Sequence, residues 1–219
     1  YRRICWGLFT VTETPENIIC NMLTTQVISP TDSDRAIADI VLKESTLAET
    51  QKISYQNTGG NVGDNIASIC ASSGLGFRLS YHPGDKQMLF ELYEGDDRTI
   101  EQRVFPQALF STEYENILST SYSLNTQDMK NVALVAGEDS GTDRKTTSVG
   151  VASGKSRREY FVDARDIQST NSDGMTISTE DYIALLKQRG TEKLADVRES
   201  QSSDCTVNTV CNTQYDQDY

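Results

Sequence analysis

The chain has 219 residues, which is enough for one large domain or two small ones with a buried core. It carries 32 Asp and Glu residues against 20 Lys and Arg residues, a formal net charge of −12. This acidity excludes duplex nucleic-acid binding that depends on counterion release, and it argues against docking on anionic lipid. The sequence contains no apolar run long enough for a membrane-spanning helix, so we expect no membrane insertion.

The N-terminal part of the chain begins with an apolar stretch over residues 1–10, which predicts a strand or a buried extended segment. The sequence Thr14-Pro15-Glu16 is typical of a helix start, with a capping Thr, Pro at the first helical position and an acid in the first turn. Apolar residues then recur at helical spacing, so we predict a helix over residues 15–26. The apolar residues of 37–42 indicate a short strand.

A second helix and a β-hairpin are expected next. The helix follows Gly59-Gly60-Asn61, buries one apolar stripe and ends at Gly74, which suits the position after a helix. Residues 77–81 alternate strictly between apolar and polar, and a second strand follows over 88–92. The turn sequence His82-Pro83-Gly84-Asp85 lies between them, so the pattern predicts a hairpin.

The second half of the chain reads mostly as strands and one long helix. Residues 132–136 are apolar on both faces, which indicates a central strand, and 159–165 have one apolar and one charged face. A helix is predicted from about residue 179 to 198 and continues through Gly190, where the missing side chain allows close backbone approach; a break at that glycine is the alternative. A short strand is expected near residues 206–210.

These elements predict an α+β fold, strand-dominated, with antiparallel sheets and three helices. Residues 1–100 would form a smaller lobe with two helices and a hairpin. Residues 101–219 would form a larger antiparallel β lobe with the long helix packed on it.

The residues give little support for catalysis. The single histidine, His82, lies in a turn, which disfavours Ser-His and Cys-His catalysis and metal sites built from several histidines. The glycines of residues 59–63 match neither phosphate-loop pattern, so a tight turn is expected there. Pairs of carboxylates such as Asp163 and Asp166 occur by chance in so acidic a chain. We therefore predict no catalytic, cofactor-binding or metal residues, and no cofactor.

A calcium-binding loop is the most specific alternative among these candidate sites. Ser169, Asn171, Asp173, Gly174 and Glu180 occupy positions 1, 3, 5, 6 and 12 of such a loop. Position 1 should be Asp, however, and the preceding segment reads as a strand. A polar loop that ends in a capped helix explains the same residues and is preferred.

The five cysteines are widely spread and form no CxxC pair. Cys20 and Cys70 fall on apolar helix faces, where small buried hydrophobes are expected. Cys205 and Cys211 could pair only in an oxidising compartment. All five thiols are expected to be reduced.

Three segments carry a resemblance to a known family. They are Tyr93-Glu94-Gly95-Asp96-Asp97-Arg98-Thr99, Lys130-Asn131-Val132-Ala133-Leu134-Val135-Ala136-Gly137-Glu138, and Arg157-Arg158-Glu159-Tyr160-Phe161-Val162-Asp163-Ala164-Arg165-Asp166. In order and spacing they resemble the tail-hub (tail-associated baseplate hub) structural proteins of siphoviruses and prophages. The likeness covers most of residues 17–219.

The resemblance implies a structural, non-enzymatic part of a phage tail tip, located in the virion tail and assembled in the bacterial host cytoplasm. Its implied partners are other tail proteins: the tube, the distal tail protein, and receptor-binding or fibre proteins. It implies a homotrimer for the full-length protein. We expect this sequence to be an internal fragment of such a protein, and the resemblance leaves a monomer open for the fragment by itself. A carbohydrate-binding or cell-wall-degrading module of a tail protein is the alternative.

The motif residues are expected to serve structure or subunit contact, and they are Gly95, Asp97, Arg98, Lys130, Asn131, Arg158, Glu159, Asp163, Arg165 and Asp166. Gly95 would allow a turn, and Asp97 with Arg98 would form a turn-stabilising pair. The charges of Glu159, Asp163 and Arg165 would either bridge to a neighbouring strand or subunit, or fix local geometry. The chain's acidity suits a hub that must not grip passing DNA.

Overall fold

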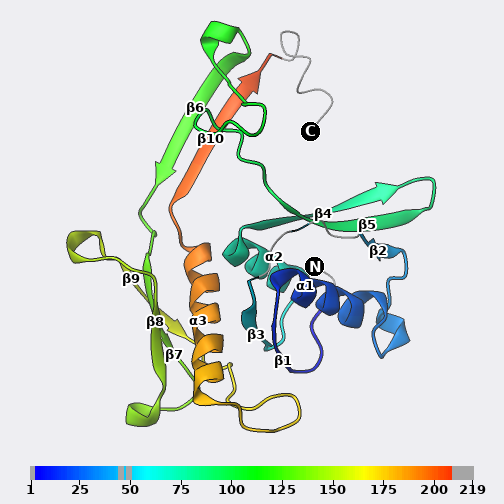
Figure 1. The fold of residues 1–219 in the computed structure, drawn as a ribbon, viewed down its shortest axis with the longest axis vertical. Helices are drawn as coiled ribbons and strands as arrows, with labels where there is room; N and C mark the ends of the chain where they lie inside the picture. The colour runs from blue at the N-terminus through cyan, green and yellow to red at the C-terminus, as the bar shows by residue number, and fades with distance from the viewer. Residues whose placement is uncertain (1–2, 44–46, 48–50, 209–219) are drawn as a thin grey trace. The chain divides into compact units, whose positions relative to one another are not determined.

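The computed structural model describes residues 3–43, 47 and 51–208 (Figure 1). These residues contain three α-helices and ten strands, which confirms the predicted α+β class with three helices. Contacts divide the chain into two compact units: unit 1 is Tyr1–Glu94 with Lys130–Val197, and unit 2 is Gly95–Met129 with Arg198–Tyr219. The predicted division into two lobes, residues 1–100 and 101–219, stays a prediction.

Unit 1 begins with strand β1 (Phe9–Glu13), which pairs antiparallel with β3 (Ile53–Asn57). Helix α1 (Pro15–Leu23) follows β1, and the Thr14 hydroxyl caps it as predicted. The helix continues as a π-helical turn over Thr24–Ile28, so the helical segment ends slightly beyond the predicted residue.

Helix α2 (Val62–Ser73) begins at Asn61, whose side chain accepts a hydrogen bond from the Gly63 amide at 2.8 Å. It ends at Gly74, whose φ of +72° confirms the predicted helix stop. Strands β4 (Leu75–His82) and β5 (Gln87–Glu94) then form the predicted antiparallel hairpin.

Strand β2 (Ile40–Leu42) joins this hairpin at the edge of β5 and runs parallel to it. The sheet is therefore mixed, where the sequence predicted antiparallel sheets only. The connection between these two parallel strands contains β3, α2 and β4, in line with the long crossover that parallel pairs require.

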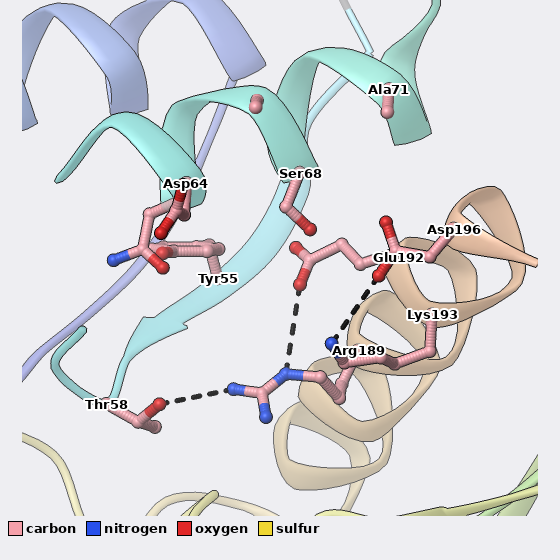
Figure 2. A pocket seen from close by; sticks show the side chains of 11 residues that line it. Tyr55, Thr58, Asp64, Ser68, Ala71, Arg189, Glu192, Lys193 and Asp196 are labelled. Carbon is pink, nitrogen blue, oxygen red and sulfur yellow. Dashed lines mark hydrogen bonds and ion pairs between the residues drawn. The ribbon is translucent and has the colours of Figure 1, made fainter. Parts of the chain in front are cut away.

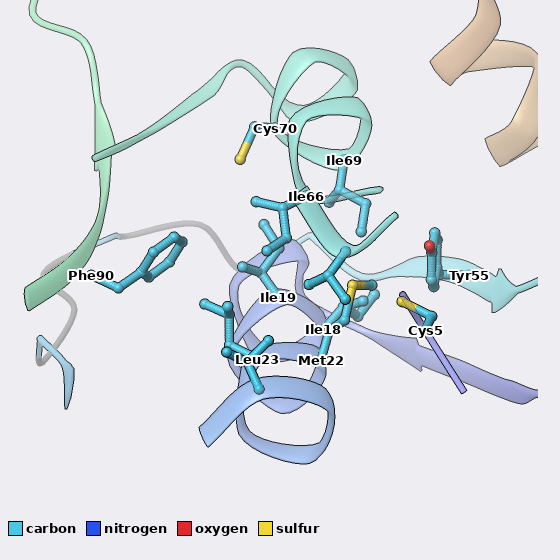
Figure 3. Packing of buried hydrophobic residues seen from close by; sticks show 12 residues of the cluster. Cys5, Ile18, Ile19, Met22, Leu23, Tyr55, Ile66, Ile69, Cys70 and Phe90 are labelled. Carbon is cyan, nitrogen blue, oxygen red and sulfur yellow. The ribbon is translucent and has the colours of Figure 1, made fainter. Parts of the chain in front are cut away.

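The first core of unit 1 lies between α1, α2 and the neighbouring strands (Figure 3). Its members are Cys5, Ile18, Ile19, Met22, Leu23, Val27, Tyr55, Val62, Ile66, Ile69, Cys70 and Phe90. Cys70 is buried as predicted and Cys20 only half-buried. The four described cysteines are free thiols, and Cys211 lies outside the described residues.

The third sheet of unit 1 has β7 (Val132–Ala136) at its centre, as predicted. Strand β8 (Thr146–Val149) pairs with β7 antiparallel, whereas β9 (Glu159–Asp163) pairs with it parallel. The chain crosses from one edge of β7 to the other between β8 and β9, which makes this sheet mixed too. Leu134 is 47% exposed, so only one face of β7 is fully covered.

Helix α3 (Thr179–Asp196) covers the buried face of this sheet and passes through Gly190 without a break, which confirms the predicted close approach. The Ser178 hydroxyl caps its first turn. The second core lies between helix and sheet, and its members are Ala133, Val135, Val162, Ala164, Ile167, Tyr182, Leu185 and Leu186. No helix within the described ranges is long and apolar enough to cross a membrane.

Unit 2 is built on a two-stranded antiparallel ribbon of β6 (Ile117–Asn125) and β10 (Ser200–Val207). The C-terminal strand begins earlier than the predicted residues 206–210, of which the last two lie outside the described residues. Buried Asn116 stabilises the loop before β6, since its side chain bonds the backbone of Leu109 at 2.7 Å and of Ser111 at 2.8 Å.

Candidate functional site

The first group of motif residues lies at the start of unit 2. The Asp97 carboxylate accepts a hydrogen bond from the Thr99 amide at 2.8 Å, and this bond lowers its pKa. Arg98 pairs with Asp96 at 3.6 Å, so the expected Asp97–Arg98 pair is not formed. Gly95 does not lie in a turn, its φ is not positive, and an added Cβ would meet open space, so this position does not require glycine.

The second group joins the starts of β7 and β9. The Asn131 side chain donates to the Ser156 carbonyl at 2.8 Å and accepts from the Arg158 amide at 2.8 Å. The Asn131 amide also donates to the Arg158 carbonyl at 3.0 Å, and the Lys130 amide donates to the Val197 carbonyl at 2.9 Å. These residues therefore fix where the parallel strands begin and where α3 ends.

The third group lies at the other end of β9. Asp163 accepts hydrogen bonds from Arg144 at 2.5 Å and from Arg165 at 2.6 Å, and the bond from Arg165 is the main cause of its lowered pKa. Glu159 pairs with Arg157 at 2.6 Å. Of the two alternatives left open by the sequence, these pairs favour local geometry, because each charge has its partner within the chain.

The fourth group connects the β9 end to α3. The Arg189 guanidinium donates to the Asp166 carboxylate at 2.7 Å and to the Thr58 hydroxyl at 3.3 Å. Burial opposes ionisation of Asp166, but the charge and hydrogen bond of Arg189 outweigh it, so the Asp166 pKa is lowered. The Nε atom of the same guanidinium lies 3.8 Å from Glu192, so one cation serves two carboxylates.

Arg189 also lines a cavity of about 470 Å³ between β3, α2 and α3, which we call the α2–α3 cavity (Figure 2). All of its lining lies in unit 1: Tyr55, Thr58, Asp64, Asn65, Ala67, Ser68, Ala71, Arg189, Glu192, Lys193 and Asp196. Its volume lies in the range of small-molecule sites, about 300–1,000 Å³, and its lining is more polar and charged than the mostly apolar lining of a typical site.

Two buried polar residues of the cavity were missed by the sequence analysis. Glu192 is 6% exposed and accepts a hydrogen bond from Gln188 at 3.1 Å. Its desolvation raises the pKa of the carboxyl, partly offset by Gln188 and Arg189. The signal was present in the spacing, because Glu192 follows buried Leu185 by two helical turns and so lies on the same face of α3.

Tyr55 is the second of these residues, and it is 7% exposed. Burial, followed by the nearby charge of Glu192, raises the pKa of its phenol. Its hydroxyl has no hydrogen-bond partner among the described residues, and no fully enclosed side-chain atom there lacks a partner. The hydroxyl is therefore not fully enclosed, and the Tyr55 side chain lines the cavity.

The other sequence candidates serve as turns. The Asn171 amide oxygen accepts hydrogen bonds from the Asp173 and Met175 amides at 3.0 Å each, as a polar loop before a capped helix requires. Gly59 and Gly60 both have positive φ, in line with the expected tight turn. In the part of the chain that the structure describes, no group of three or more His, Cys, Asp and Glu side chains is placed to hold a metal ion.

Comparison with protein families gives one result for the whole chain. Residues 1–219 match the model of the family described as "Siphovirus ReqiPepy6 Gp37-like protein". This match includes all three segments on which the resemblance to tail hubs depends. No curated protein matches the chain.

Proposed function

The chain belongs to the Siphovirus ReqiPepy6 Gp37-like protein family, and we propose that it is a structural, non-enzymatic subunit of a phage or prophage tail tip or baseplate hub. In this role it links the tail tube to the host-recognition or penetration parts. Its partners are tube, distal-tail and receptor-binding or fibre proteins, and the full-length protein is a homotrimer. It works in the virion tail after assembly in the host cytoplasm.

The observation that carries this proposal is the exposed ribbon of unit 2. Leu118, Tyr122 and Leu124 of β6 are 66%, 64% and 51% exposed. Neither β6 nor β10 pairs with a third strand within the described residues, and a two-stranded ribbon is only marginally stable in water. Such a ribbon gains stability when strands of another subunit cover it.

The charge of the ribbon supports the same role. Strand β6 contains no charged residue and β10 contains only Asp204, in a chain whose net charge is −12. Exposed strand edges of monomeric proteins usually carry charges or Pro that prevent pairing. The missing charges allow this edge to meet a second acidic subunit without like-charge repulsion.

The motif residues add a second line of support. Asn131, Asp163 and Asp166 bond to the backbone or to arginines of their own unit, which is the work of a scaffold. Asn131 lies at the start of β9, whereas Asp163 and Asp166 lie at its other end, each held by an arginine. A scaffold role requires only that they hold strands and α3 in register.

Fractionation of purified particles tests the proposal. Phage particles are separated into heads and tails, and each fraction is digested and examined by mass spectrometry for peptides of this chain. We expect the peptides in the tail fraction at a few copies per particle. Their absence from particles, when the protein is made during infection, would overturn the proposal.

One observation favours carbohydrate binding as a second candidate. Trp6 is 54% exposed and lines an open hollow of about 350 Å³ with Gln26, Thr31 and Asp32. The Arg35 guanidinium lies 4.2 Å from the centroid of the Trp6 ring. Binding on a glycan array that is lost in Trp6→Ala would support this candidate, and a silent array would count against it. Release of peptidoglycan fragments would support a wall-degrading module, and we expect none.

A further inference from the structure

The α2–α3 cavity has more negative than positive charge around it. Asp64, Glu192 and Asp196 line it as carboxylates, against the cations Arg189 and Lys193. Lys193 is paired with Asp196 at 3.5 Å, so these two neutralise each other.

Arg189 cannot neutralise the rest. Its short bond is to Asp166 at 2.7 Å, and Glu192 lies farther away at 3.8 Å. Glu192 is nevertheless the most buried charged group of the lining, with 6% of its surface exposed. A buried carboxylate with a shared counter-ion is costly in the folded protein, and an added cation would relieve this cost.

Tyr55 supplies an independent observation. Its side chain lines the same cavity and is 7% exposed, and its hydroxyl has no protein partner among the described residues. A phenolic oxygen accepts hydrogen bonds as well as donating them. The ammonium group of an amine has three donors and no acceptor, and so matches a carboxylate and a hydroxyl oxygen together.

We propose that the α2–α3 cavity binds the ammonium group of an alkylamine, with Glu192 as its counter-ion and the Tyr55 hydroxyl as a second acceptor. The exposed rim residues Thr58, Asp64 and Asp196 leave the cavity open to solvent, so the amine enters from outside. The amine is either a free diamine or the side chain of a lysine on a partner protein. The proposal does not depend on the tail function.

Titration of the full chain tests this site. 1,4-Diaminobutane, N-acetyl-lysine methylamide and the uncharged 1,4-butanediol are each added at constant ionic strength, with calorimetry and amide chemical shifts as readouts. We expect both amines to bind saturably with shift changes near Tyr55, Ser68 and Arg189, and we expect no binding of the diol. Stronger binding of the lysine derivative assigns the source to a protein partner, and stronger binding of the diamine assigns it to a free amine.

Matched variants separate the site from general acidity. Glu192→Gln should weaken amine binding about tenfold or more, since it removes a charge-assisted hydrogen bond, and Tyr55→Phe should weaken it several-fold. Glu180→Gln removes an exposed carboxylate of the same helix outside the cavity. This variant should bind the amines with the affinity of the parent protein.

Three results would overturn the proposal: no saturable amine binding, equal binding of the diol, or unchanged affinity in Glu192→Gln. If Glu192→Gln does not fold, the amide chemical-shift changes of the parent protein on addition of the amines test the site instead. Shifts confined to residues outside the cavity lining then refute the site.

Discussion

Tyr182 shows how one buried hydroxyl holds the second core of unit 1 to its sheet. Its side chain is 1% exposed, its oxygen accepts from the Glu138 amide at 2.9 Å, and it donates to the Ile167 carbonyl at 3.2 Å. Gly137 lies so close that an added Cβ would be 2.2 Å from this oxygen. The sequence predicted the helix that carries Tyr182, but not the backbone groups that its hydroxyl would satisfy.

Removing this hydroxyl should destabilise the protein. Tyr182→Phe leaves the Glu138 amide and the Ile167 carbonyl without a partner in a buried place, which should cost about 1–3 kcal/mol of unfolding free energy. Urea denaturation followed by circular dichroism measures the change. Tyr114→Phe removes a hydroxyl from a side chain that is 62% exposed and should leave stability within about 0.5 kcal/mol. Equal stability of the two variants would contradict this role.

Glu192 gives a prediction about pH, because burial raises the pKa of its carboxyl. The folded state then holds the proton more tightly than the unfolded state. Protonated Glu192 makes its full contribution to stability below the pKa that this carboxyl has in the unfolded protein. The contribution is lost as the pH rises through the pKa that the carboxyl has in the folded protein. Each unit by which the pKa is raised costs about 1.4 kcal/mol at neutral pH.

Glu192→Gln should therefore be more stable than the parent at pH 7, and the difference should shrink as the pH falls below the unfolded carboxyl pKa. Unfolding free energies from urea titrations between acid and neutral pH measure this difference. A difference that does not change with pH, or a less stable variant at pH 7, would contradict burial as the dominant effect.

Among the helices and strands, the features set by local sequence could be predicted, whereas the pairings of distant strands could not. The cap at Thr14, the stop at Gly74 and the hairpin all depend on neighbours along the chain, so local patterns predicted them. The parallel pairing of β2 with β5 and of β7 with β9 depends on distant residues and carries no local signal. The cavity was missed for the same reason, since three separate elements bring its residues together.

Gly190 tests the packing of α3 on its sheet. An added Cβ would lie 2.7 Å from Val135 Cγ2 and 2.8 Å from Val149 Cγ2, and branched strand side chains cannot easily move aside. Gly190→Ala should lose about 1–2 kcal/mol, because overpacking outweighs the better helix propensity of Ala. Gly95→Ala has open space and no positive φ, so it should change thermal or urea stability by less than about 0.5 kcal/mol. A stabilised Gly190→Ala would contradict the close approach.

At the scale of the whole molecule, two properties support the tail-tip proposal: the strong acidity of the chain, and the ribbon of unit 2 whose strands contain a single charged residue, Asp204. The −12 charge disfavours contact with DNA phosphates, which suits a protein assembled near a DNA path without binding it. We propose the ribbon as the place where the chain meets another subunit. Composition alone predicted the first property, whereas the second required knowing that β6 pairs with β10 and that both remain exposed.

A charge placed on the ribbon should block assembly. Tyr122→Asp, supplied to a phage that lacks its own copy, should lower incorporation into particles at least about tenfold, because burying an unpaired charge costs several kcal/mol. Tyr81→Asp changes an equally exposed strand tyrosine of the unit 1 hairpin, 61% against 64%, and should be incorporated normally. Immunoblots of purified particles measure both. Normal incorporation of Tyr122→Asp would show that the ribbon is not an assembly surface.

The tail-tip location is the central claim, and immunogold electron microscopy of intact particles tests it most directly. Antibodies raised against residues 1–219 label purified particles, and the position of the gold is recorded relative to the head and the tail end. The account predicts gold at the distal end of the tail. Gold at the head, or gold along the whole tube, would contradict it.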